Sequence, residues 1–156
     1  MKRSCAHIIF FAFLFVSFPA PAQQTRVGTF DQTSIVIAYY RSPLWSDTLK
    51  AKQAELKEAE KAGNTAKADA LKAWGGESQE LAHKQLAGEA PITNIMDALK
   101  PAFAEIEKSA HVSNVTPYTA AINQTDSVDV TGPLLDWLKA DEKTRQLIDQ
   151  LPKKSN

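Results

Sequence analysis

The sequence predicts an α+β fold that is mostly helical, with a long antiparallel helical hairpin projecting from a small base of β-strands. Three observations carry this prediction. Residues 50–72 consist largely of Ala, Lys, Glu, Gln and Leu, which are strong helix formers. The sequence Gly63-Asn64-Thr65 divides this helical region into two parts. Short segments rich in Val and Thr lie before and after the region, and such residues favour strands.

The base is expected to begin with a strand over Arg26–Phe30, a short segment with several apolar residues. Asp31 or Ser34 is placed to cap a helix that follows it. The next apolar run, Ile35–Tyr40, fits either a strand or a short buried helix, because brief apolar runs do not distinguish the two. The proline in Ser42-Pro43 suits the first turn of a helix.

The hairpin is expected to consist of two long helices between residues 44 and 88. Few of their residues are apolar, so both helices would expose wide polar faces. Gly63 can end the first helix and Asn64 or Thr65 can cap the second, and helices joined so briefly run antiparallel. Each residue of Gly75-Gly76 costs about 1 kcal/mol relative to alanine inside a helix, so a kink or hinge is predicted there.

The next helix has the clearest apolar periodicity in the chain. Pro101 lies within it and predicts a kink near Ala98. Its apolar residues recur every three or four positions, which predicts a face packed in the core. These residues are Ile92, Ile95, Met96, Leu99, Phe103 and Ile106.

After this helix the pattern becomes typical of strands. Val112–Val115 and Ala120–Ile122 are expected to be short strands. The residues from 127 onward lead into a helix for which Thr131 is the expected N-cap. Asp126 and Asp129 are expected to accept hydrogen bonds from backbone groups near the start of that helix. A last helix is expected over Asp141–Leu151.

Residues 1–22 have the organisation of a secretory signal peptide. Lys2 and Arg3 are followed by an apolar run ending at Phe18, and Ala20-Pro21-Ala22 forms a small-residue cleavage site. The run has about thirteen residues, fewer than the roughly 20 of a membrane-spanning helix. The sequence therefore predicts a single domain, residues 23–156, exported from the cytoplasm without a transmembrane anchor.

The composition argues against several classes of function. Basic and acidic side chains balance at 18 each, which gives no electrostatic case for a nucleic-acid partner. The one cysteine, Cys5, lies in the predicted signal peptide, so no disulfide or thiol chemistry is expected after cleavage. His83 is expected to be a solvated side chain and His111 to end a helix. No metal-ligand spacing, phosphate loop or catalytic constellation appears, so no enzyme, metal or cofactor is predicted.

The tryptophans of the hairpin have two interpretations. Trp45 and Trp74 lie in helices with few apolar residues. They either pack the two helices together or face a partner protein. Long helices with so few apolar residues are stable when they pair in the manner of a coiled coil.

Three segments resemble the Skp/OmpH family of periplasmic chaperones. Val27–Asp31 is similar to the first strand of that family, and Lys52–Ala70 resembles its charged arm. Ser127-Val128-Asp129-Val130-Thr131, followed by Leu134–Leu138, resembles the segment that leads into its last helix. The chain departs from the family in its near-neutral charge and in its C-terminal extension after residue 139. Its arm is also shorter and is interrupted at Gly63, Gly75-Gly76, Gly88 and Pro91.

The resemblance implies an arm over residues 43–110, a base over 26–42 and 111–139, and a helical extension over 140–156. It also implies a homotrimer with a shared base, whose arms hold unfolded outer-membrane or exported proteins without ATP. The candidate client contacts are Leu56, Leu71, Trp74 and Leu81. The alternative is a non-catalytic envelope adaptor whose arm binds one folded partner, with Trp45 and Trp74 as anchors.

Overall fold

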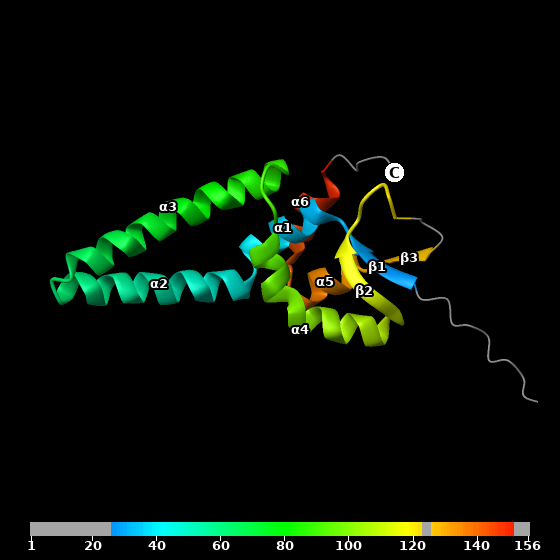
Figure 1. Ribbon diagram of the computed structural model, residues 1–156, viewed down its shortest axis with the longest axis horizontal. Coiled ribbons are helices and arrows are strands. Elements are labelled where there is room, and N and C mark those ends of the chain that lie inside the picture. The colour runs from blue at the N-terminus through cyan, green and yellow to red at the C-terminus, as the bar shows by residue number, and fades with distance from the viewer. Residues whose placement is uncertain (1–25, 123–125, 152–156) are drawn as a thin grey trace, which may run out of the picture.

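A computed structural model describes residues 26–122 and 126–151, so the predicted signal peptide lies outside the described residues. The described chain is mostly helical and contains a small sheet, which confirms the predicted class at this level. None of its helices combines the length and the apolar character needed to cross a membrane. The elements shown in Figure 1 are β1 (Arg26–Phe30), α1 (Gln32–Arg41), α2 (Pro43–Lys61), α3 (Thr65–Ala87), α4 (Thr93–Ser109), β2 (Val112–Pro117), β3 (Ser127–Asp129), α5 (Thr131–Trp137) and α6 (Glu142–Asp149).

The sheet has three parallel strands in the order β2-β1-β3, with β1 in the centre. Gly28 of β1 pairs with Val115 on one side and Val128 on the other. A Cβ atom at Gly28 would lie 3.1 Å from Val112 Cγ2 and 3.2 Å from Val115 Cγ2. The absence of a side chain at Gly28 therefore lets β2 approach β1 closely.

The prediction of a strand over Ala120–Ile122 is wrong, because no strand covers these residues. β2 continues to Pro117, and the Tyr118 N–H then donates to the Phe30 carbonyl at 2.8 Å. The chain turns after this point, where the Ile122 N–H donates to the Thr119 carbonyl. The other edge of β1 is occupied by β3 instead, so the third strand comes from a later segment.

The ambiguous run Ile35–Tyr40 is helical and forms most of α1. Asp31 caps this helix, because its Oδ1 accepts hydrogen bonds from the Ser34 N–H at 2.7 Å and the Ser34 hydroxyl at 2.6 Å. Ile35, Val36 and Ala38 are fully buried. The run is apolar because it is a core helix enclosed by several other elements.

α4 contributes the apolar face that its periodicity predicts. Ile95, Leu99 and Ala102 are fully buried, and together with Ile92 and Ile106 they belong to the main core cluster. The same cluster contains residues of β1, α1, β2 and α5. α4, which the sequence analysis grouped with the arm, therefore packs with the base. Figure 1 shows α4 changing direction along its length, as its internal Pro101 predicts.

α2 and α3 lie side by side and extend away from the sheet (Figure 1). Residues 62–64 join them, with Gly63 at φ +65° and the Asn64 side chain capping α3 through the Lys67 N–H at 3.0 Å. An ion pair of 3.0 Å connects Glu60 of α2 to Lys72 of α3. α3 is one uninterrupted helix that includes Gly75-Gly76, the position at which a kink or hinge was expected.

The start of α5 differs from the prediction in one respect. Thr131 is the first helical residue and is not the N-cap, and its hydroxyl accepts a hydrogen bond from the Asp31 N–H at 3.0 Å. The Asp129 carboxylate accepts from the Thr131 N–H at 2.8 Å, as expected for a group that satisfies a helix start. The Thr131 side chain is therefore used to connect β1 with α5.

α6 is held against α1 by polar contacts. The Arg41 Nε donates to Thr144 Oγ1 at 2.9 Å, and Thr144 is almost fully buried. Asp141 caps α6 by accepting from the Thr144 N–H at 2.8 Å. The described part of the C-terminal extension, residues 140–151, thus packs on the base.

Candidate functional site

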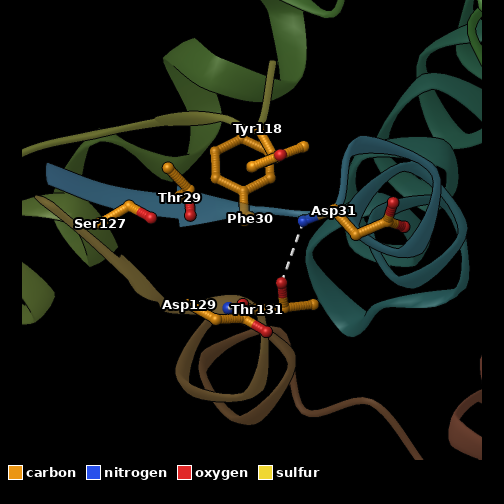
Figure 2. A pocket seen from close by; sticks show the side chains of 7 residues that line it. All are labelled: Thr29, Phe30, Asp31, Tyr118, Ser127, Asp129 and Thr131. Atoms are coloured by element: carbon orange, nitrogen blue, oxygen red, sulfur yellow. Dashed lines mark hydrogen bonds between the residues drawn. The ribbon is translucent and has the colours of Figure 1, made fainter. Parts of the chain in front are cut away.

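The first candidate site is a cleft of about 320 Å³ at the carboxyl ends of the three strands. Parallel sheets bind ligands at this edge in many α/β proteins. Figure 2 shows the seven side chains that line it, which come from β1 and β3 and from residues that follow each of the three strands. These residues, the strand cleft, are Thr29, Phe30, Asp31, Tyr118, Ser127, Asp129 and Thr131.

The polar groups of the strand cleft are largely engaged within the fold. Asp31 caps α1, the Asp129 carboxylate accepts from the Thr131 N–H at the start of α5, and the Thr131 hydroxyl accepts from the Asp31 N–H along the dashed line in Figure 2. Within residues 26–122 and 126–151, no group of three or more His, Cys, Asp or Glu side chains could hold a metal ion. The carboxylates of the strand cleft therefore connect the sheet to the starts of two helices.

The second candidate site is an apolar groove of about 390 Å³ where α2 and α3 meet α1. Leu49 and Leu86 line it with 37% and 43% of their surface exposed. Ligand cavities of this size are typically lined by aromatic and aliphatic side chains with a few polar groups. The residues that form this site, the root groove, are Tyr40, Trp45, Leu49, Trp74, Gly75, Ser78, Gln79, Ala82, His83 and Leu86.

Aromatic rings form one side of the root groove. The ring centroids of Trp45 and Trp74 are 6.0 Å apart, and those of Tyr40 and Trp45 are 5.1 Å apart in an edge-to-face arrangement. Tyr39 extends the cluster, with its ring 5.9 Å from that of Trp45. Such pairs contribute about 0.5–1.5 kcal/mol beyond the burial of their surface. Trp45 and Trp74 thus pack the two helices together and also line the groove.

A buried amide holds the groove against the base. Gln85 is 1% exposed, and its Nε2 donates to the Pro91 carbonyl at 2.7 Å and to Asn94 Oδ1 at 2.6 Å. Its Oε1 accepts from the Tyr40 hydroxyl at 2.8 Å. Burial raises the pKa of Tyr40, against a smaller opposing effect of a hydrogen bond with Asn94. Tyr40 therefore stays protonated at neutral pH and remains a hydrogen-bond donor.

The predicted contact residues are only partly brought together. Leu56, Leu71, Trp74 and Leu81 are all half-buried on α2 and α3. Among these four, only Trp74 lines the root groove. Sequence reasoning did not select Leu49, Leu86 or Tyr40 as contact residues. The sequence shows Leu49 and Leu86 as isolated apolar residues in polar helices, which is a signal that could have selected them. Tyr40 gives no such signal, because it lines the groove only through the packing of α1 against α3.

The two histidines have different positions. His83 is exposed on α3, as predicted, and lines the root groove. His111 is exposed and follows the end of α4, where its φ of 52° lies in the left-handed region. Neither belongs to a cluster of metal-ligating side chains in the described part of the chain.

Comparisons with known proteins find no match to this chain among protein-family models, curated proteins or solved structures. The features of the molecule that bear on function are therefore its two cavities and the surface of α2 and α3. Of the two cavities, the root groove is the one that leaves large apolar side chains exposed.

Proposed function

We propose that the protein is a divergent Skp/OmpH-like holdase of the periplasm, non-catalytic and independent of ATP. Its clients are unfolded outer-membrane or exported proteins. In this proposal residues 1–22 direct export, and α2 and α3 act as a coiled-coil-like arm that projects from the base. The resemblance in Val27–Asp31 and Val128–Leu138 supports the family assignment.

The observation that carries the proposal is the exposure of large apolar side chains on otherwise polar helices. Four such side chains are exposed in the described part of the chain, and three of them, Leu44, Leu49 and Leu86, belong to α2 and α3. Exposed apolar groups that cluster on a soluble protein mark interaction surfaces. A holdase needs many weak apolar contacts on a soluble frame, because it must retain a client without folding onto it.

The charged residues of the same helices support solubility. Lys50–Asp47 and Lys61–Glu58 are exposed ion pairs on α2, and Lys84–Glu80 is one on α3. Pairs of this kind contribute little to stability. Their role in this proposal is to keep the arm hydrated between its apolar contacts.

The proposed oligomer is a homotrimer with a shared base. β2 and β3 are the two edges of the three-stranded sheet of a single chain. Edge strands present unpaired backbone groups that can pair with another chain. Light scattering on a sizing column measures the mass of residues 23–156 in solution, and a trimer is the expected result. A stable monomer would contradict the shared base.

The direct test is suppression of aggregation. A denatured outer-membrane β-barrel protein is diluted into buffer without ATP, with or without an equimolar amount of the trimer of residues 23–156. Light scattering by the client should rise more slowly in the presence of the protein. An unchanged rate of aggregation would reject the holdase function.

The second candidate function is a specific envelope adaptor, which the compact aromatic side of the root groove favours. Replacing Trp74 by alanine separates the two functions poorly, because the Trp74 ring contacts Trp45 and packs the helices. Leu86→Ser changes an exposed side chain instead. A dispersed holdase surface should lose less than about twofold in client affinity, whereas a specific interface should lose about tenfold or more.

A further inference from the structure

Gly75 and Gly76 occupy the interior of α3, although glycine is one of the least favourable residues in a helix. Neither residue has the positive φ that would require glycine. Apart from the adjacent residues and the backbone of α3 itself, nothing lies within 4 Å of a Cβ atom at either position, so no close packing excludes a side chain. Neither backbone conformation nor packing accounts for the two glycines.

The two positions differ in their surroundings. Gly75 lines the root groove, whereas Gly76 is exposed and is not part of the groove lining. A side chain on residue 75 would occupy part of the groove. Departures from good helix sequence without a structural reason are most often found at functional sites. Gly75 therefore indicates that an open groove is useful to the protein.

We propose that the root groove binds one aromatic side chain of an uncharged, unfolded polypeptide segment, and that Gly75 keeps the groove open for it. This inference deepens the holdase function proposed above and depends on that function for the class of polypeptide. It assigns the groove to a single bulky side chain, in contrast to the dispersed contacts along the rest of α2 and α3.

The aromatic preference follows from the rings that line the groove. Tyr40, Trp45 and Trp74 present a continuous aromatic surface, with neighbouring centroids 5.1 Å and 6.0 Å apart. Aromatic rings pair favourably in offset or edge-to-face geometry, in addition to the burial of their surface. The volume of about 390 Å³ lies near the lower end of the range for ligand cavities. The groove is therefore matched to a side chain and its neighbours, and not to a folded element.

The lack of Asp, Glu, Lys and Arg in the groove lining favours an uncharged segment. Two charged pairs on the same helices are engaged with each other, with Lys50 Nζ 3.3 Å from Asp47 Oδ1 and Lys84 Nζ 2.6 Å from Glu80 Oε1. A charged segment would lose water here without gaining a counter-charge from the lining. Three polar side chains of the lining can bond to peptide groups beside the bound ring: Ser78, Gln79 and His83.

Unfolded outer-membrane barrels contain segments with these properties. Their strands carry an apolar band bordered by girdles of aromatic residues at the two membrane interfaces. Such a strand supplies aromatic side chains next to its apolar, uncharged lipid-facing residues. The groove would therefore retain the client segments that are later needed at the membrane interface.

The probe is the blocked peptide acetyl-Gly-Ser-Phe-Ser-Gly-amide, compared with the same peptide carrying alanine in place of phenylalanine. NMR of residues 23–156 follows the methyl groups of Leu49 and Leu86 and the indole N–H of Trp74. The peptide is added up to about 5 mM, since a single side-chain contact gives a dissociation constant on the order of 1 mM. The expected result is saturable shifts of these signals with the phenylalanine peptide and not with the alanine peptide.

Gly75→Leu and Gly76→Leu form a matched pair of variants. Both replace a glycine in α3 by a strong helix former in open space, so both should fold. Gly75→Leu fills the groove and should weaken peptide binding at least about tenfold, whereas Gly76→Leu should stay within about twofold of the unchanged protein. Equal binding by the two variants, or no saturable shift in the unchanged protein, would overturn the proposal.

The client aggregation assay separates this inference from the proposed function. Suppression of aggregation without peptide-induced shifts would reject the aromatic site and leave the holdase function intact. Saturable peptide shifts without suppression would support the site and reject the holdase function.

Discussion

The Tyr40 hydroxyl donates a hydrogen bond of 2.8 Å to Gln85 Oε1, and this bond joins α1 to α3 beside the root groove. The amide nitrogen of Gln85 also donates to the Pro91 carbonyl and to Oδ1 of Asn94, the second residue of α4. One buried side chain thus connects three helices. The orientation of α3 on the base depends on this network.

Gln85→Ala should lower the free energy of unfolding by about 2–4 kcal/mol, because it leaves several buried polar groups without a partner. Tyr40→Phe removes one hydroxyl and should lower it by about 1–3 kcal/mol. Urea unfolding followed by circular dichroism measures both values. Gln53→Ala, at an exposed position of α2, is the matched control and should change stability by less than about 0.5 kcal/mol. Equal stabilities of Gln85→Ala and Gln53→Ala would contradict the role of the network.

Gly28→Ala should destabilise the sheet by about 1–3 kcal/mol, because overpacking forces neighbouring atoms to move. The added Cβ would lie 3.3 Å from the Asn114 carbonyl oxygen, in addition to its contacts with two valine methyl groups. Thermal unfolding of the variant provides the measurement. Gly132→Ala is the control, since nothing lies within 4 Å of its Cβ position and α5 should tolerate or favour alanine. A Gly28→Ala protein as stable as the unchanged chain would show that β2 can move away from β1 at little cost.

Gly75→Ala and Gly76→Ala should each stabilise the protein by about 0.5–1 kcal/mol, because alanine fits the helical backbone and loses less entropy on folding. Gly63→Ala and Gly88→Ala should have the opposite effect. These two glycines have φ values of +65° and +78°, which strain any residue with a Cβ atom. Melting temperatures of the four variants test the contrast. A destabilised Gly75→Ala protein would contradict the presence of open space beside that residue.

The start of α6 should be sensitive to acid. Hydrogen bonds from the side chain and the backbone N–H of Thr144 hold the pKa of Asp141 below its ordinary value of 3.8. A carboxylate with a lower pKa in the folded state adds stability above its ordinary pKa, and this stability is lost as the pH falls through the folded value. Asp141→Asn keeps a capping oxygen but removes the titration.

The stability difference between the unchanged protein and Asp141→Asn should therefore shrink as the pH is lowered below 3.8. Urea unfolding at a series of pH values between about 5 and 2 measures this difference. A difference that stays constant across the range would mean that Asp141 does not act as a charged cap.

Some features depend on neighbouring residues and could be predicted from the sequence. The break at Gly63 and Asn64 and the helix that starts at Pro43 are formed by interactions within one helical turn. The buried face of α4 also follows from local periodicity, because residues three or four apart share one side of a helix.

Other features depend on residues distant in the sequence and could not be predicted. Ile35–Tyr40 is apolar enough for a strand or a helix, and its position inside the core determines that it is a helix. The third strand is β3 and not Ala120–Ile122, because pairing is determined by the available edge of β1. Threonine is a common N-cap residue, and Thr131 was predicted to cap the helix. Its hydroxyl instead accepts a hydrogen bond from the N–H of Asp31, which is 100 residues away in the sequence.

The sequence by itself determined the helices between residues 43 and 109, the breaks between them and the residues that face the core along α4. The tertiary structure alone decided which apolar side chains stay exposed and where they form a cavity. The root groove exists because Tyr40 of α1, Trp45 of α2 and Trp74 of α3 converge at one point. Helix propensity and capping act over a few residues, whereas burial depends on which distant segments pack together.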